Sequence, residues 1–204
     1  MIFNNLLRIL RDYKISIIKI FLYEFIYIFF GFKGNKFNFS NNKFMADDIP
    51  TPYFFLRKIK IYLTFLNFNT FIDFGCGSGR VIYYLSKFFP KKKFIGMEFF
   101  PKQFAYSSNL FKDNKNVNIY KKNFTKIDIS KYKADCFFFN NPFLNNLDFL
   151  VFIKYLVKIN KKNKKTIFIF VNFNKKIFSK LTNLKKINSY YISSNKGFYF
   201  YKIK

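Results

Sequence analysis

The sequence predicts an α/β domain built on a mostly parallel seven-stranded sheet that ends in an antiparallel hairpin. From about residue 50 onward, short apolar runs alternate with longer stretches of helical spacing, which is typical of βαβ units and a parallel sheet. Each run has five residues or fewer and is bounded by Gly, Asn, Pro or Lys, as expected for strands buried on both faces. Two further apolar segments near the end flank a short polar loop and predict the hairpin.

The predicted elements follow one another along the chain in a simple alternation. The parallel strands are expected at Phe71–Phe74, Phe94–Met97, Val117–Tyr120, Cys136–Phe139 and Ile167–Val171. The helices are expected at Arg80–Phe89, Lys102–Lys112, Leu147–Ile159 and Lys175–Leu184. The hairpin pairs Ile187–Ile192 with Phe198–Ile203 across the loop at residues 193–197.

The first part of the chain is set apart by its composition. We expect an N-terminal hydrophobic helix and linker over residues 1–45, followed by the main domain over residues 46–204. Ile15–Phe32 is nearly all apolar over 18 residues, close to the length that crosses a bilayer. Glu24 falls near its middle, where a charge is costly in lipid. The sequence therefore favours a helix packed on the domain or on a partner, with membrane association through Ile15–Phe32 as the alternative.

The charge of the chain is strongly basic, with a formal net charge of +27. Such a balance is typical of proteins that bind nucleic acid or an anionic membrane. Only four of the 37 basic residues are Arg, and Phe, Tyr, Ile, Lys and Asn dominate, which are residues of A/T-rich codons. Since Arg is the better phosphate ligand, we interpret the charge mainly as coding bias and keep nucleic acid as an alternative partner.

Two residue types limit the possible chemistry. Histidine is absent, which excludes His-based nucleophile pairs, His general bases and His metal sites. Cys76 and Cys136 are too few for a disulfide framework or a Cys-only zinc site. We expect structural thiols in a cytoplasmic protein and no metal site.

A glycine-rich turn after the first strand carries the functional argument. Asp73 ends the strand, Gly75, Gly77 and Gly79 follow at alternate positions, and a helix begins at once. Glycines there permit positive φ and close approach of a ligand to the backbone, and the helix N-terminus favours an anionic group. Arg80 stands where the nicotinamide fingerprint needs a glycine, and no P-loop Lys follows.

A carboxylate at the end of the second strand completes the pattern. Glu98 lies 25 residues after Asp73, where a carboxylate can accept both ribose hydroxyls of an adenosine. Together these residues resemble motif I and the acidic loop of class I S-adenosylmethionine-dependent methyltransferases, over roughly residues 50–204. The resemblance implies a three-layer Rossmann-like sandwich and S-adenosyl-L-methionine as cofactor.

The same resemblance assigns roles to the cofactor-binding residues. It implies that Asp73 and the three loop glycines hold the methionine part of the cofactor and that Glu98 holds the ribose. Asn123, after the third strand, stands where the family often has an acidic residue near the adenine. An amide can still bond to the adenine edge.

The fourth strand runs into Asn140-Asn141-Pro142-Phe143, which resembles the (Asp/Asn/Ser)-Pro-Pro-(Tyr/Phe) motif of amino-group methyltransferases. Asn141 replaces the first proline. The resemblance implies that Asn140, Asn141 and Phe143 are the catalytic, substrate-side residues, which orient a target N–H group and stack on a planar acceptor. An ordinary Asn-Pro turn explains the same residues, and both interpretations stay open.

One segment upstream of the glycine turn admits two interpretations. Pro50-Thr51-Pro52 resembles the segment of lysine methyltransferases lacking a SET domain that closes over the cofactor. The favoured interpretation is a helix start, with Thr51 as the cap and Pro52 in the first turn.

The sequence as a whole predicts a methyltransferase acting on a nitrogen of a protein or small-molecule acceptor by direct displacement. A nucleic-acid base methyltransferase and a non-catalytic, membrane-associated S-adenosylmethionine-binding protein are the alternatives.

Overall fold

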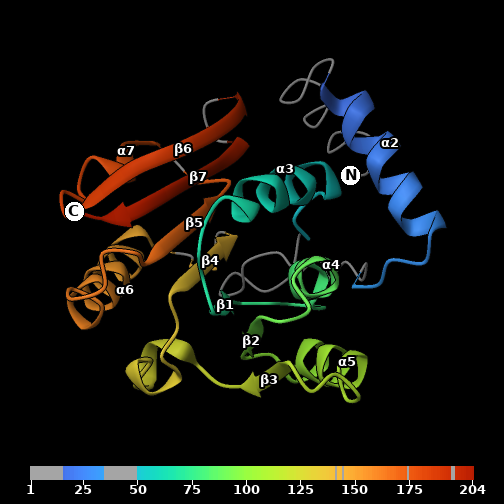
Figure 1. The fold of residues 1–204 in the computed structure, drawn as a ribbon, viewed down its shortest axis with the longest axis horizontal. Helices are drawn as coiled ribbons and strands as arrows, with labels where there is room; N and C mark the ends of the chain where they lie inside the picture. The colour runs from blue at the N-terminus through green and yellow to red at the C-terminus, as the bar shows by residue number, and fades with distance from the viewer. Residues whose placement is uncertain (1–15, 35–49, 141, 144, 174, 194–195) are drawn as a thin grey trace.

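The computed structural model describes residues 16–34, 50–140, 142–143, 145–173, 175–193 and 196–204. Its centre is one seven-stranded sheet with the strand order β3-β2-β1-β4-β5-β7-β6 (Figure 1). The strands are β1 (Thr70–Phe74), β2 (Lys93–Glu98), β3 (Val117–Lys121), β4 (Cys136–Asn140), β5 (Ile167–Val171), β6 (Leu184–Ser193) and β7 (Lys196–Ile203). Strands β1 to β5 run parallel, and β7 is antiparallel to both β5 and β6. The predicted fold class is confirmed.

Helices cover both faces of the sheet and complete the three layers (Figure 1). The helices α3 (Tyr53–Thr64), α4 (Arg80–Phe88) and α5 (Pro101–Leu110) lie on one face. The helices α6 (Asn146–Ile159) and α7 (Lys175–Phe178) lie on the other. Because parallel strands need a crossover between them, this alternation places all the strand-to-helix turns at the carboxyl edge of the parallel strands.

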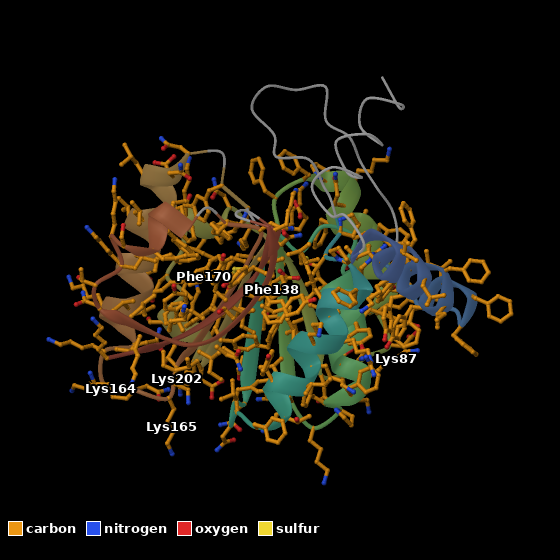
Figure 2. All side chains as sticks on the ribbon, turned by 90° about the horizontal axis from the view of Figure 1, so that it is seen from above. Lys87, Phe138, Lys164, Lys165, Phe170 and Lys202 are labelled. Carbon is orange, nitrogen blue, oxygen red and sulfur yellow. The ribbon has the colours of Figure 1, made fainter. Side chains whose placement is uncertain are left out.

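Phenylalanine fills the two cores on either side of the sheet. Successive side chains of a strand point to opposite faces, so Phe138 packs with α3 and α4, while Phe139 packs with α6. Figure 2 labels Phe138 and Phe170, which belong to different cores, and Lys164 and Lys165, which project outward. The two cores beside the sheet are therefore built largely from Phe, and no Lys is among their buried residues.

Helix α7 is shorter than the predicted helix Lys175–Leu184. Only Lys175–Phe178 is helical, and Leu184 already belongs to β6. The residues between form tight turns, in which Leu181 N–H bonds Phe178 O and Leu184 N–H bonds Leu181 O. Ile177, Leu181 and Leu184 are all buried, and their spacing suits a helix and a turn followed by a strand equally well. The prediction of a long helix there is wrong.

The N-terminal helix α2 (Ser16–Phe29) packs against α3 and α4. Its inner face presents Tyr23, Glu24 and Tyr27; the Tyr27 ring stacks on Tyr53 at 4.9 Å, and its hydroxyl bonds that of Tyr84. Among the described residues, no helix combines the length and the apolar character that crossing a bilayer requires. The expectation of a helix packed on the domain is met.

Glu24 joins α2 to the rest of the molecule through a largely buried ion pair. Its Oε2 lies 2.7 Å from Nη1 of Arg80, whose side chain is 2% exposed against 19% for Glu24. Its Oε1 accepts the Tyr53 backbone N–H at 2.8 Å, and the Arg80 guanidinium lies 4.5 Å from the Tyr53 ring centroid. The acidic residue inside the apolar run thus has a structural partner within the domain.

Removing the Glu24 carboxylate is expected to destabilise the fold, because it leaves the buried Arg80 charge without its counter-ion. For Glu24→Ala we expect the free energy of unfolding to fall by about 3 kcal/mol, at the lower end for a broken buried pair. Urea denaturation followed by circular dichroism measures it. Lys19→Ala, an exposed change on the same helix, is the control. Equal stability of the two variants would contradict the structural role of the pair.

Candidate functional site

The glycine loop crosses from the end of β1 to the end of β2 before it enters α4. The backbone N–H groups of Gly75 and Cys76 both donate to the Met97 carbonyl, at 2.8 and 3.2 Å. Gly75, Gly77 and Gly79 have φ values of +73°, +52° and +84°. Three left-handed residues at alternate positions make a tight turn that presents backbone, without side chains, at the carboxyl edge of the sheet.

Glu98 holds this loop in place from the neighbouring strand. Its carboxylate is 5% exposed; Oε2 accepts the Gly77 N–H at 2.8 Å, and Oε1 accepts the N–H groups of Phe99 and Phe100 at 2.7 and 2.8 Å. Three backbone donors fix the carboxylate in one orientation. These bonds use three of the roughly four lone-pair sites of the carboxylate.

A cavity above the strand ends brings together three of the predicted site residues. Asp73, which is 2% exposed, lines it together with Gly75 and Asn140. Asn140 ends β4, and its Oδ1 accepts the Nδ2–H of Asn172 at 3.3 Å. The full lining also contains Pro50, Thr51, Cys76, Ser78, Arg80, Val81 and Phe138. A carboxylate, an amide and the backbone of a glycine therefore line one small cavity.

Five predicted residues lie outside this cavity lining, namely Gly77, Gly79, Glu98, Asn123 and Phe143, and a sixth lies outside the described residues. The Asn123 side chain caps the short 3₁₀ helix Phe124–Lys126, since its Oδ1 accepts the N–H and hydroxyl of Thr125 at 3.1 and 2.7 Å. The half-buried Phe143 ring packs against Phe124, with ring centroids 5.4 Å apart, and against α6. Asn141 is not among the described residues.

Comparison with known protein families identifies the kind of domain that carries this site. A family model described as a methyltransferase domain matches residues 71–162, a range that holds the glycine loop, Glu98 and the end of β4. The chain contains a class I S-adenosylmethionine-dependent methyltransferase domain. Its cofactor is S-adenosyl-L-methionine, so the resemblance inferred from the glycine turn and Glu98 is confirmed.

Solved structures of low sequence identity share the fold of this methyltransferase. The human methyltransferase 10 domain containing protein is 14% identical, with a TM-score of 0.60 over 89% of this chain and 93% of its own. An RNA methyltransferase from Salinibacter ruber is 14% identical, with a TM-score of 0.58 over 76% of this chain and 94% of its own. The N,N-8-amino-8-demethyl-D-riboflavin dimethyltransferase from Streptomyces davawensis is 8% identical, with a TM-score of 0.60 over 74% of this chain. This chain spans 54% of that enzyme's length. No curated protein sequence matches.

Thr51 has a different environment from the one expected. Helix α3 begins at Tyr53 with Pro52 at the N-cap and no side-chain capping bond, so the prediction of Thr51 as the cap is wrong. The Thr51 side chain is 1% exposed and lines the cavity with Asp73. Its hydroxyl makes no hydrogen bond to any described residue. A buried hydroxyl without a partner is costly, and a polar ligand group in the cavity would satisfy it.

Arg80 and Gly34 form the part of the site that the sequence did not reveal. The Gly34 carbonyl accepts the Ser78 hydroxyl at 2.7 Å and Nε of Arg80 at 3.4 Å. A Cβ on Gly34 would lie 2.5 Å from the Arg80 Cα, so only glycine permits this contact. The chain after α2 therefore packs directly on the first turn of α4. Glu24, an isolated acid in an apolar run, was the one available signal, because a buried acid needs a basic partner.

Among the described residues, the cysteines and the acidic side chains form no metal site beside the cavity. Cys76 and Cys136 are buried, and burial, followed by the nearby Asp135 charge, raises the pKa of Cys136 well above its usual value. Over the part of the chain that the structure describes, no group of three or more His, Cys, Asp or Glu side chains could hold a metal ion.

Alanine at Gly79 is expected to damage the loop more than alanine at a comparable glycine. Gly31 (φ +73°) and Gly79 (φ +84°) share the left-handed conformation, but a Cβ on Gly79 would meet the Phe111 ring at 2.8 Å while one on Gly31 meets nothing within 4 Å. We expect Gly31→Ala to cost about 1 kcal/mol of stability and Gly79→Ala about 1–3 kcal/mol more. Thermal denaturation compares them, and equal losses would refute the tight packing of the loop.

Proposed function

We propose that this methyltransferase transfers the methyl group of S-adenosylmethionine to a nitrogen atom of a protein or small-molecule acceptor. The observation that carries the proposal is the position of Asn140, at the end of β4 in the same cavity as Asp73 and Gly75. An amide oxygen there accepts a hydrogen bond from an acceptor N–H group beside the cofactor loop. The amino-riboflavin dimethyltransferase that shares the fold supports this acceptor class.

The proposal extends to cofactor roles for individual residues. Asp73 and the loop residues Gly75, Gly77 and Gly79 hold the methionine part, and Glu98 binds the ribose hydroxyls. Asn123 contacts the adenine; because its Oδ1 caps a 3₁₀ helix, its Nδ2 is the atom left to donate to a ring nitrogen. The Thr51 hydroxyl is an additional ligand group for the methionine end.

The proposed catalysis depends on alignment more than on acid–base chemistry. The bound cofactor supplies an activated methyl group, and direct displacement needs the acceptor nitrogen held in line with it. Asn172 donates to Asn140 Oδ1, which fixes the amide so that its oxygen can orient the acceptor. Asn141 is proposed as a second polar contact, and Phe143, whose ring is partly exposed, as an apolar wall for the acceptor.

A nucleic-acid base methyltransferase is the second candidate, favoured by the net charge of +27 and by the RNA methyltransferase that shares the fold. The two arginines within the described residues count against it. Arg80 is paired with Glu24, and Nη1 of Arg57 donates to the Tyr23 hydroxyl at 2.8 Å. The buried Arg80 guanidinium is therefore unavailable for the forked phosphate contacts that Arg makes best, which leaves the exposed Arg57 alone among the described arginines.

Glu98→Ala is expected to weaken the binding of S-adenosylhomocysteine by about 100-fold or more, because two hydrogen bonds to a carboxylate are lost. Calorimetric titration measures it, and circular dichroism confirms that the variant folds. Asp128→Asn is the matched control, since Asp128 is an exposed carboxylate that bonds Ser130. Unaltered affinity of the Glu98 variant would refute its role at the ribose.

Asn140→Ala is expected to lower kcat by about tenfold to 100-fold, the effect of one lost orienting contact. The binding of S-adenosylhomocysteine should change less than about threefold, because the removed contact is to the acceptor. The assay follows labelled methyl groups from the cofactor into a cell lysate separated into protein, RNA and small-molecule fractions. Asn118→Ala, at an exposed position on β3, is the control.

The distribution of the label separates the candidate functions. Alkali-stable label in the protein or small-molecule fraction, reduced by Asn140→Ala, supports N-methylation. Label in the RNA fraction that ribonuclease releases would establish the second candidate instead. Tight cofactor binding without transfer to any fraction would leave a non-catalytic cofactor-binding protein.

A further inference from the structure

Helix α2 has a second apolar face that points away from the domain. Its side chains lie at helical spacing and are 48–74% exposed, in contrast to the inner face that packs on α3 and α4. In Figure 2 the ring-bearing side chains of α2 project outward from the edge of the molecule. The outer face consists of Ile18, Phe21, Leu22, Phe25, Ile28 and Phe29, and is extended by Phe30. An apolar stripe of this size on a protein surface marks a site of interaction.

Basic residues flank the outer face on both sides. Lys19 and Lys33 are exposed at either end of it, and Arg57 and Lys58 follow on α3, where the Arg57 guanidinium lies 5.4 Å from the Tyr23 ring centroid. The pKa of Lys58 is lowered by burial and then by the charges of Arg57 and Lys19. On α4, Lys87 Nζ lies 4.6 Å from the Phe32 ring centroid (labelled in Figure 2).

Carboxylates do not balance these cations. Glu24 is the single acidic residue of α2, α3 and α4, and it is committed to Arg80 on the inner side. Over the described residues of α2, α3 and α4, the charges around the apolar stripe are therefore positive. This combination matches a partner that offers an apolar layer beneath a layer of negative charge.

We propose that the outer face of α2 docks on the surface of an anionic lipid membrane. The helix has 14 residues and is about 21 Å long, which is too short to cross a hydrocarbon core of about 30 Å. It therefore lies along the interface, with its rings at the level of the headgroups and its flanking cations against the lipid phosphates. The inner face keeps the Glu24–Arg80 pair, so docking requires no rearrangement of the domain.

The charges argue against a second copy of this chain as the occupant. A symmetric dimer through the outer face would bring Lys19, Lys33 and the α3 cations of one copy toward the same cations of the other. Like charges at such a contact are unfavourable, and no acidic residue of α2, α3 or α4 is left to compensate them. A lipid surface removes the rings from water and neutralises the cations at once.

Co-sedimentation of the full-length protein with lipid vesicles tests the proposal. We expect binding to vesicles of phosphatidylcholine mixed equally with phosphatidylglycerol, weaker binding to phosphatidylcholine alone, and a decrease with added salt. Phe25→Ser with Phe29→Ser should lower the partition coefficient by at least about tenfold. Lys19→Gln with Lys33→Gln should lower it by about tenfold on anionic vesicles.

Phe65→Ser is the matched control. Phe65 is 83% exposed but caps the C-terminus of α3, at the opposite end from the Tyr53 contact with α2, and its loss should leave vesicle binding unchanged. All variants should bind S-adenosylhomocysteine as the wild type does, which separates this test from that of the cofactor site.

Three results would overturn the proposal. The first is a wild-type protein that stays in the supernatant with anionic vesicles. The second is vesicle binding that the Phe25/Phe29 double variant retains in full. The third is a wild-type protein that does not bind vesicles but self-associates with rising concentration in sedimentation velocity, while the double variant stays monomeric. That result would assign the outer face to a second copy of the chain.

Discussion

The carboxylate of Glu98 is the constraint on which the site depends. The carboxyl ends of two adjacent parallel strands meet at one edge, and the chain leaving β1 must turn sharply there without blocking that edge. Glu98 accepts the Gly77 N–H from one side and the N–H groups of Phe99 and Phe100 from the other. A single carboxylate thereby fixes the loop after β1 and the turn after β2 relative to each other. The loop that Glu98 holds also lines the cavity with Asp73 and Asn140, through Gly75, Cys76 and Ser78.

Local pattern explains why the strands and the cofactor loop could be predicted from the sequence. Each of these patterns spans only a few residues: a short buried run, alternate glycines, or an acid at the end of a strand. Such patterns can be interpreted without knowledge of the fold. The helix over Lys175–Leu184 could not be settled in this way, because burial of Ile177, Leu181 and Leu184 fits two conformations. The prediction of Thr51 as a helix cap was wrong for a related reason, since threonine is equally suited to a helix cap and to the wall of a polar cavity.

Contacts between distant residues could not be predicted from local pattern. Arg80 was informative only as a residue that breaks the nicotinamide fingerprint, whereas in the structure its guanidinium is bound by Glu24, 56 residues earlier in the chain. The division between residues 1–45 and 46–204 stays a prediction, because residues 35–49 lie outside those described. The roles of the individual site residues likewise stay proposals, although Asp73, Gly75 and Asn140 share one cavity.

The contact of Gly34 and Glu24 with Arg80 has a consequence for the history of the chain. A guanidinium buried beside Tyr53 is tolerable only with its carboxylate, and the backbone at Gly34 fits only without a side chain. A change at one of the three positions is therefore unfavourable unless the others change with it. In diverging relatives, we expect positions 24, 34 and 80 to be exchanged together or retained together, so that loss of the N-terminal helix coincides with loss of the arginine.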